Sequence, residues 1–286
     1  MKKFTMAASL MCALSTVAPS AKAAPIVQVV VAIDESGSMG GEQAWVGGMI
    51  TTLATQLSNL GYAAEFGLVG FGNGINATAN LGRMFDMGAG AGVQQFGTAA
   101  EFNVADNGLV TDGSNEDGYA ALNFIMSNYT FTVGSIRNFI LITDEDRDDL
   151  SNPDSVTLPQ GVLLNAIVNN PFGCTGGGTG SVIGRTTSTG YRVNGTGGYT
   201  TCTSPTTGDG ANNTETQYVP LALNSGGAAW NLEILRNGGN YATSFTKAFV
   251  DIKVQEITSG VPEPATWGMT ALGLLGLGIL RRKRAA

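Results

Sequence analysis

Histidine is absent from the 286 residues, and its absence excludes several kinds of active site. A chain without imidazole has no Ser-His-Asp triad, no imidazole base and no zinc site with histidine ligands. Basic residues are also scarce away from the two ends. Residues 25–260 hold 8 Lys and Arg against 21 Asp and Glu, a net charge of −13. Such an acidic domain repels nucleic acid, so we expect no nucleic-acid partner.

The N-terminal segment has the pattern of a secretory signal peptide. Lys2 and Lys3 precede an apolar stretch over residues 6–17, and Ala21-Lys22-Ala23 supplies a small-x-small cleavage site. We therefore predict a signal peptide over residues 1–23, removed on export through the inner membrane.

The last residues, 259–286, combine three elements. Pro262-Glu263-Pro264 leads into an apolar stretch over residues 265–280, and a basic cluster follows at residues 281–284. The stretch is shorter than the roughly 20 residues of a spanning helix, and the basic cluster favours the cytoplasmic side. This arrangement resembles the PEP-CTERM sorting signal of Gram-negative bacteria. The resemblance implies transient membrane association through the C-terminal helix, processing by the protease exosortase, and release to the cell surface or extracellular matrix. The alternative is an ordinary C-terminal membrane anchor.

Cysteine is rare, and the two cysteines left after export form an even pair. Cys174 and Cys202 are expected to form a disulfide in an oxidising compartment. The bond would close a loop of about 28 residues and contribute about 3 kcal/mol. The surrounding segment, 173–216, contains 12 Gly and 13 Thr among 44 residues and no hydrophobic periodicity. We predict a long inserted loop, either functional or disordered.

An apolar run over residues 26–33 stops at Asp34 and is followed by Ser36 and Ser38. The run predicts a buried central strand of a parallel sheet. Such a strand delivers the three side chains to its carboxyl end, where open α/β sheets bind ligands. One carboxylate and two hydroxyls suit Mg²⁺ or Ca²⁺ rather than zinc or copper. The alternative is a turn with capping serines before a helix.

Strand and helix patterns alternate along the rest of the chain. The sequence predicts an α/β fold, Rossmann-like and doubly wound, with a mostly parallel central sheet flanked by helices, in one domain over residues 24–258. Further strands are expected at 63–71, 138–143 and 161–168, a short edge strand at 81–87, and a strand at 230–235. Helices are expected at 46–60, 117–129 and 244–257.

Asp34-x-Ser36-x-Ser38 after a buried strand, together with this order of elements, resembles the metal-ion-dependent adhesion site of von Willebrand factor type A (vWA) domains. The resemblance spans residues 26–258. It implies that Asp144, which closes the strand at 138–143, is a second acidic residue of the site. Two aspartates at the ends of buried strands are hard to explain by packing alone.

The vWA pattern also has a threonine in the intervening loop, and this chain departs from it. The loop reads Asp112-Gly113-Ser114-Asn115-Glu116-Asp117. Ser114 supplies the hydroxyl in one interpretation, and Glu116 supplies a carboxylate in the other. An extra carboxylate would hold the metal more tightly and lower its attraction for an anionic ligand. Asp117 we interpret as a first-turn charge favoured by the helix dipole.

The resemblance implies binding rather than catalysis, because one position on the metal is left for an acidic side chain of a partner. We expect an exported, non-enzymatic adhesion module that uses Mg²⁺ or Ca²⁺ and binds a protein carboxylate or an extracellular polysaccharide matrix. One alternative is a structural matrix protein whose metal only stabilises the fold. Another is a metal-dependent hydrolase with Asp34 as nucleophile, which would need a carboxylate where Ser36 stands. The acidic residues 145–149 are either a solvated loop or a separate Ca²⁺ site.

Overall fold

The apolar run at the start of the mature chain forms β1 (Ile26–Asp34), in which every residue after the first is buried. It pairs in parallel with β2 (Ala63–Phe71) on one side and with β4 (Ile136–Thr143) on the other. Both of its faces are covered, so its sequence is nearly continuous in Val and Ile rather than alternating. The computed structural model describes residues 23–72, 82–88, 90–113, 116–148, 155–176, 180–210 and 213–259.

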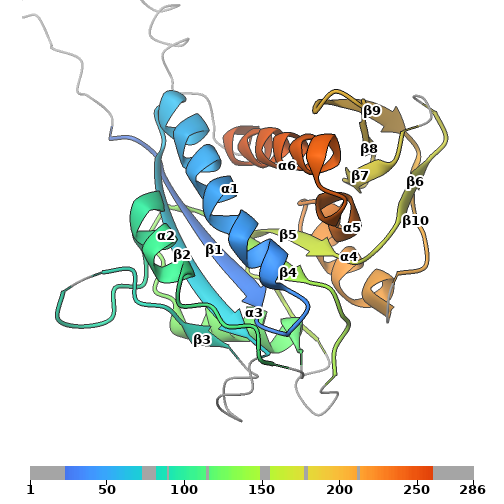
Figure 1. The fold of residues 1–286 in the computed structure, drawn as a ribbon. Helices are drawn as coiled ribbons and strands as arrows, with labels where there is room; N and C mark the ends of the chain where they lie inside the picture. Colours follow the sequence, from blue (N-terminus) through green and yellow to red (C-terminus); the bar gives the residue numbers. More distant parts are fainter. Residues whose placement is uncertain are drawn as a thin grey trace, which may run out of the picture.

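Within these residues the main sheet has nine strands, in the order β3-β2-β1-β4-β5-β11-β7-β8-β9 (Figure 1). β5 (Leu163–Val168) and β11 (Ala229–Asn231) continue the parallel part. Short antiparallel strands extend both edges: β3 (Arg83–Met84) on one, and β7 (Val182–Arg185), β8 (Thr189–Val193) and β9 (Tyr199–Thr203) on the other. The predicted doubly wound α/β fold with a mostly parallel core is confirmed.

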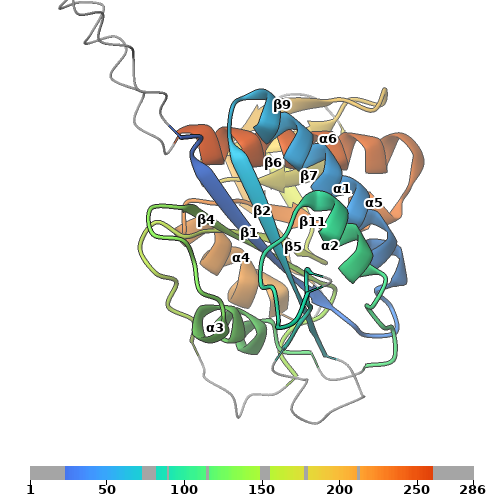
Figure 2. The same cartoon turned by 90° about the vertical axis from the view of Figure 1, so that its left-hand side faces the viewer.

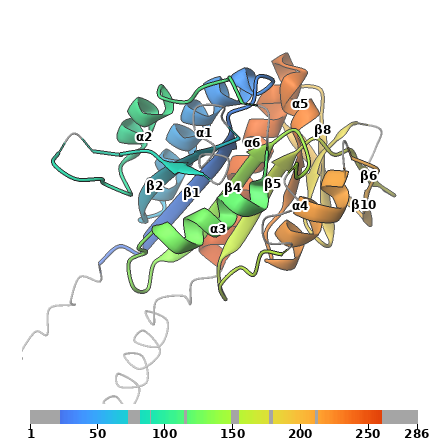
Figure 3. The ribbon, with the colours of Figure 1, turned by 90° about the horizontal axis from the view of Figure 1, so that it is seen from below.

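Helices cover both faces of this sheet (Figures 2 and 3). One face carries α1 (Gly40–Asn59), α2 (Ala99–Asp106), α5 (Leu232–Arg236) and α6 (Gly239–Ser259), and the other carries α3 (Gly118–Asn128) and α4 (Thr214–Asn224). The sequence patterns did not predict α2 or α4. Both are short, and α2 depends on a capping box between Thr98 and Glu101, which stabilises a helix start independently of apolar periodicity.

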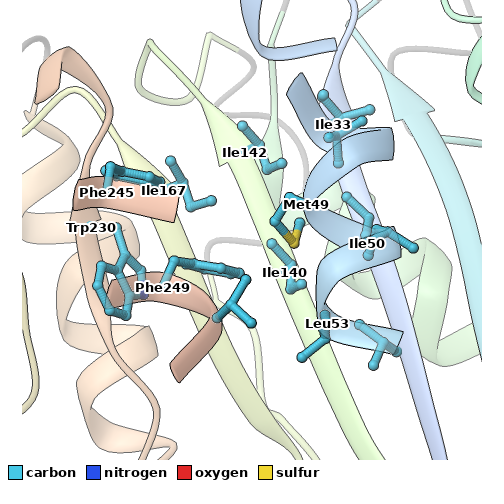
Figure 4. Packing of buried hydrophobic residues seen from close by; sticks show 14 of the residues in the cluster. Ile33, Met49, Ile50, Leu53, Ile140, Ile142, Ile167, Trp230, Phe245 and Phe249 are labelled. Atoms are coloured by element: carbon cyan, nitrogen blue, oxygen red, sulfur yellow. The ribbon is translucent and has the colours of Figure 1, made fainter. Parts of the chain in front are cut away.

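The larger core lies between the sheet and the pair α1 and α6 (Figure 4). Fully burying an aliphatic or aromatic side chain contributes about 1.5–3 kcal/mol, so this layer fixes both helices on the sheet. α6 runs away from the carboxyl ends of the strands, and β1 begins at the same edge at which α6 ends (Figures 1 and 3). The labelled residues of the layer are Ile33, Met49, Ile50, Leu53, Ile140, Ile142, Ile167, Trp230, Phe245 and Phe249.

The Gly- and Thr-rich segment 173–216 is not the long loop that its composition suggested. It supplies β7, β8 and β9 of the main sheet, and β6 (Phe172–Cys174) pairs with β10 (Pro205–Thr207) in a second, two-stranded sheet. β-branched threonine favours strands, and strands near a sheet edge need few apolar residues. The predicted disulfide between Cys174 and Cys202 is present and joins β6 to β9, with a Cα–Cα distance of 6.0 Å.

The strand expected at 230–235 is also only partly correct. β11 ends at Asn231, whose side-chain oxygen accepts a hydrogen bond from the backbone N–H of Glu233 and caps the short helix α5. The alternating pattern therefore concealed a strand-to-helix junction.

The predicted signal peptide (to residue 22) and the predicted sorting signal, with Pro262, Glu263 and Pro264, lie outside the described residues. Among the residues that are described, the helices do not combine the length and apolar character needed to cross a membrane.

Candidate metal centre

Asp34 and Asp144 come together at the point where the winding of the sheet reverses. The chain passes from β1 to β2 on one side and later returns to β4 on the other, so the carboxyl ends of β1 and β4 are neighbours. Asp34 ends β1, and its Oδ2 accepts a hydrogen bond of 2.9 Å from Oγ1 of Thr143, the last residue of β4. Asp144 follows directly. Such a crevice is where doubly wound folds bind ligands.

The turn after β1 folds around the carboxylate of Asp34. Its Oδ1 accepts a hydrogen bond of 2.7 Å from the backbone N–H of Ser36, which is the local turn that aspartate favours. The hydroxyl oxygens of Ser36 and Ser38 consequently lie 3.2 Å apart. Ser38 donates from Oγ to Oδ1 of Asp144 across 3.1 Å. The two serines and the two aspartates therefore form one continuous group of oxygen atoms.

Glu116 enters this group from the loop before α3. An isolated bridge pairs Ser36 with Gly113, and Ser114 lies outside the described residues. The backbone N–H of Glu116 donates to Oδ2 of Asp148 across 3.1 Å, and the N–H of Asp148 donates to the carbonyl of Glu116 across 2.9 Å. These paired bonds hold Glu116, only 3% exposed, against the crevice.

The carboxylates of Asp34, Glu116 and Asp144 each place an oxygen within 4.8 Å of the others. Burial raises the pKa of Asp34, and burial followed by the charge of Asp34 raises the pKa of Glu116. Within the described chain, Oε2 of Glu116 is buried and has no hydrogen-bond partner. A cation would satisfy that oxygen and offset the repulsion among the three carboxylates. The donors are all oxygen atoms, so the residues fit a hard divalent cation.

Asp117, expected as a first-turn charge, is instead the N-cap of α3. Its Oδ1 accepts hydrogen bonds from the backbone N–H groups of Tyr119 and Ala120. The same carboxylate forms a buried two-point ion pair with Arg147, with distances of 3.0 and 3.2 Å. The guanidinium of Arg147 also lies 4.6 Å from the ring centre of Tyr119. This pair connects the loop after β4 to the start of α3, the two segments that carry Asp144 and Glu116.

Arg236, at the end of α5, is a residue of the site that sequence reasoning missed. Its Nη2 donates to Oδ2 of Asp144 across 2.8 Å, and its Nε donates to Glu42 across 2.7 Å. Glu42 and Asp144 are both buried. The one feature of the sequence that could have drawn attention to Arg236 is the small number of arginines, since residues 25–260 contain six. Its distance of 92 positions from Asp144 gave no local cue.

A groove of about 410 Å³ opens beside Ser38 and Arg236. Ser38, one of the serines of the oxygen group, lines this groove together with the indole of Trp45 and the aliphatic side chain of Leu235. The groove therefore offers both polar and apolar contacts to a ligand. Its lining residues are Ser38, Gly41, Glu42, Trp45, Leu235, Arg236 and Ala242.

The acidic loop after Asp144 makes structural contacts. Asp148 holds Glu116 as described, and Asp146 accepts a hydrogen bond of 3.2 Å from the side chain of Asn213. Burial, followed by the charges of Asp144, Asp148 and Asp146, raises the pKa of Glu145. Asp149 lies outside the described residues.

Comparison with known proteins gave structural similarities only. No protein-family model matches the chain, and no curated protein matches it. An aerotolerance-related membrane protein from Bacteroides fragilis is 16% identical, with a TM-score of 0.42, over 82% of this chain and 99% of that one. BatB, a conserved hypothetical protein from Bacteroides thetaiotaomicron, is 16% identical, with a TM-score of 0.41, over 81% and 99%.

Proximal thread matrix protein 1 from the mussel byssus, in a structure with zinc in its MIDAS motif, is 16% identical, with a TM-score of 0.33. The match covers 51% of this chain and 39% of that one. The fold class of the present chain is defined by its own strand order and pairing.

Proposed function

We propose that this chain is a binding module of the vWA type that holds a partner through a divalent cation. The observation that carries the proposal is the meeting of three carboxylates and two serine hydroxyls at the switch point of the sheet, beside a groove. Asp34, Ser36, Ser38, Glu116 and Asp144 would hold the ion. When bound, Mg²⁺ or Ca²⁺ would supply a positive centre able to accept an oxygen ligand from outside the protein.

Arg236 supports an acidic or hydroxyl-rich partner. Three carboxylates would exceed the charge of a divalent ion by one, and the guanidinium, which Asp144 shares with Glu42, lowers the negative charge at this edge of the site. A carboxylate in the groove would therefore meet the guanidinium as well as the ion. A polysaccharide hydroxyl meets the same groups, with the ring of Trp45 along the groove as an apolar contact.

Binding is a better account of these residues than catalysis. In the hydrolase alternative, Asp34 would attack as a nucleophile and would need a second carboxylate two residues along, where Ser36 stands. We therefore propose a non-enzymatic role. The pattern of the two terminal segments supports export, processing by exosortase, and display at the cell surface or in the extracellular matrix.

The test is retention of the purified chain on extracellular matrix from the source cells, measured with Mg²⁺, with Ca²⁺ and with EDTA. The temperature is kept well below the unfolding transition of the EDTA-treated chain, since any ligand of the folded state raises the transition by mass action. We expect retention with metal and its loss in EDTA and in Asp34→Ala, whereas the control Glu65→Gln, on β2 away from the crevice, is retained.

Equal retention in all three solutions contradicts the proposal. It would instead assign the metal to fold stability, provided that chelation still lowers the transition temperature.

A further inference from the structure

A second polar cluster lies inside the main apolar layer, between α6 and the sheet. Lys253 and Glu256 of α6 face Asn165 of β5, and the lysine and the asparagine are 0% exposed. Nδ2 of Asn165 donates to Oε2 of Glu256 across 2.8 Å, and Nζ of Lys253 contacts the same oxygen at 3.5 Å. The amine and the amide nitrogen therefore share one carboxyl oxygen, in a site where the glutamate side chain is 9% exposed.

The amide of Asn165 is held in a polarised state. Its Oδ1 accepts a hydrogen bond of 2.8 Å from Nε1 of Trp230, and a fixed donor at a carbonyl oxygen stabilises negative charge that develops there. Its Nδ2 donates a hydrogen bond to Oε2 of Glu256. The carbonyl carbon is thus prepared for attack, and its leaving nitrogen already contacts a group that can deliver a proton.

The surroundings favour uncharged forms of the other two groups. Burial lowers the pKa of Lys253, although Glu256 opposes the shift, and burial raises the pKa of Glu256. Aromatic rings pack beside the site: Trp230 stacks on Tyr191, and it packs edge-on against Phe249 (Figure 4). A neutral amine is the nucleophilic form of lysine, and desolvation is a recognised way to produce it. Oε1 of Glu256 has no hydrogen-bond partner among the described residues.

We propose that Lys253 and Asn165 form an intramolecular isopeptide bond, with Glu256 as the proton carrier. Nζ of Lys253 attacks Cγ of Asn165, a new N–C bond forms, and the bond from Cγ to Nδ2 breaks. Glu256 transfers one proton from Nζ to Nδ2, and ammonia leaves. The step is an acyl transfer that balances without an oxidant or a cofactor.

The reaction requires Nζ of Lys253 to move from the carboxyl oxygen of Glu256 to the carbonyl carbon of Asn165. Attack needs Nζ within about 3–3.5 Å of Cγ, and the flexible four-carbon stem of lysine can supply that approach from its position on the shared oxygen. The product joins the third residue of β5 to α6 and cross-links two elements that are 88 positions apart in the chain.

Peptide mapping of the full chain under denaturing conditions tests the bond. We expect one branched peptide that contains both Asn165 and Lys253 and is lighter by one ammonia than the two linear peptides together. Trypsin should fail to cleave after Lys253. Recovery of Asn165 and Lys253 in separate, unmodified peptides from the folded wild-type chain would overturn the proposal.

Two variants test the assigned roles. Glu256→Gln keeps the shape of the side chain but removes the proton carrier, so separate peptides are expected; a branched peptide in this variant would overturn the role given to Glu256. Lys247→Arg is the matched control, because Lys247 lies on the same helix, is exposed and pairs with Asp251 at 2.7 Å. It should leave the branched peptide unchanged. The wild-type digest decides the bond even where a variant fails to fold.

Discussion

The guanidinium of Arg236 binds Asp144 across 2.8 Å and Glu42 across 2.7 Å, so one cation joins the start of α1, the end of β4 and the end of α5. Residues from three distant parts of the sequence thereby meet at the edge of the candidate metal centre. The contact constrains the position of Asp144, and it also places a positive charge beside any divalent ion held there.

Arg236→Met should affect metal binding and stability in opposite directions. Removing a positive charge a few ångströms from the site should raise divalent-ion affinity by about tenfold. The buried carboxylate of Glu42 would lose its partner, which should lower the free energy of unfolding by about 1–3 kcal/mol. Calorimetric titration and urea unfolding measure the two effects. The double variant Arg236→Met, Glu42→Gln should recover part of the lost stability; equal losses in the single and double variants would contradict the pairing.

Glu116→Gln should weaken metal binding and stabilise the chain in EDTA. The change removes one of three crowded, buried carboxylates, so repulsion falls when no cation is present, and the ion loses a charged ligand. We expect at least about a tenfold loss of Mg²⁺ or Ca²⁺ affinity, measured by calorimetry, with Glu65→Gln unchanged. Ser114→Ala should have the smaller effect. The reverse order of the two effects would assign the ligand from this loop to Ser114.

Asp117→Asn should destabilise the fold strongly. The substitution removes the charge of Asp117 from a buried two-point ion pair, and breaking such a pair costs about 3–5 kcal/mol. Chemical denaturation measures the loss. Lys247→Met breaks the exposed pair with Asp251 and serves as the comparison, for which less than about 1 kcal/mol is expected. Similar losses for the two variants would show that the buried pair contributes no more than a surface contact.

Asp106 should make stability fall as the pH rises through the acid range. Burial against α1 raises its pKa from 3.8 to about 6. Between these two values the folded chain keeps a proton that the unfolded chain has lost, so stability declines with rising pH. Asp106→Asn should therefore stabilise the protein at pH 7, by about 1 kcal/mol after allowance for solvent screening, and have little effect at pH values below the lower pKa.

Asp86 should show the opposite dependence of stability on pH. Hydrogen bonds from the backbone N–H groups of Gly88 and Gln94 lower its pKa, so its contribution is present at neutral pH and is lost as the pH falls through the folded-state pKa. Asp86→Asn should destabilise the chain at neutral pH. Unfolding curves of both variants and the wild type over the acid range provide the measurement. Parallel pH profiles for Asp106→Asn and wild type would contradict the role of Asp106.

The sequence predicted the parts of the fold that follow from burial. The runs that became β1 and β4 are apolar because both faces of the sheet are covered, and Asp34 and Asp144 are conspicuous where those runs stop. The sequence did not predict the edge strands β7–β9, because they carry too few apolar residues to show a hydrophobic period. It did not predict α2 either, because that helix is stabilised by its capping box rather than by an apolar face. The contacts of Arg236 and of the Lys253–Asn165 cluster join residues far apart in the sequence, so local spacing could not predict them.

The placement of the two ends of the fold has a mechanical consequence. The candidate binding groove is lined by Ser38, which follows the carboxyl end of β1, and by Arg236. In contrast, β1 starts and α6 ends at the opposite edge of the sheet (Figures 1 and 3). A pull between a captured partner and an anchored end of the chain would act along the length of β1 and α6. The hydrogen bonds to β2 and β4 would then be loaded together, in shear, rather than opened one after another. Such a geometry resists tension through a high barrier to forced unfolding, which is set by the unfolding rate and not by equilibrium stability.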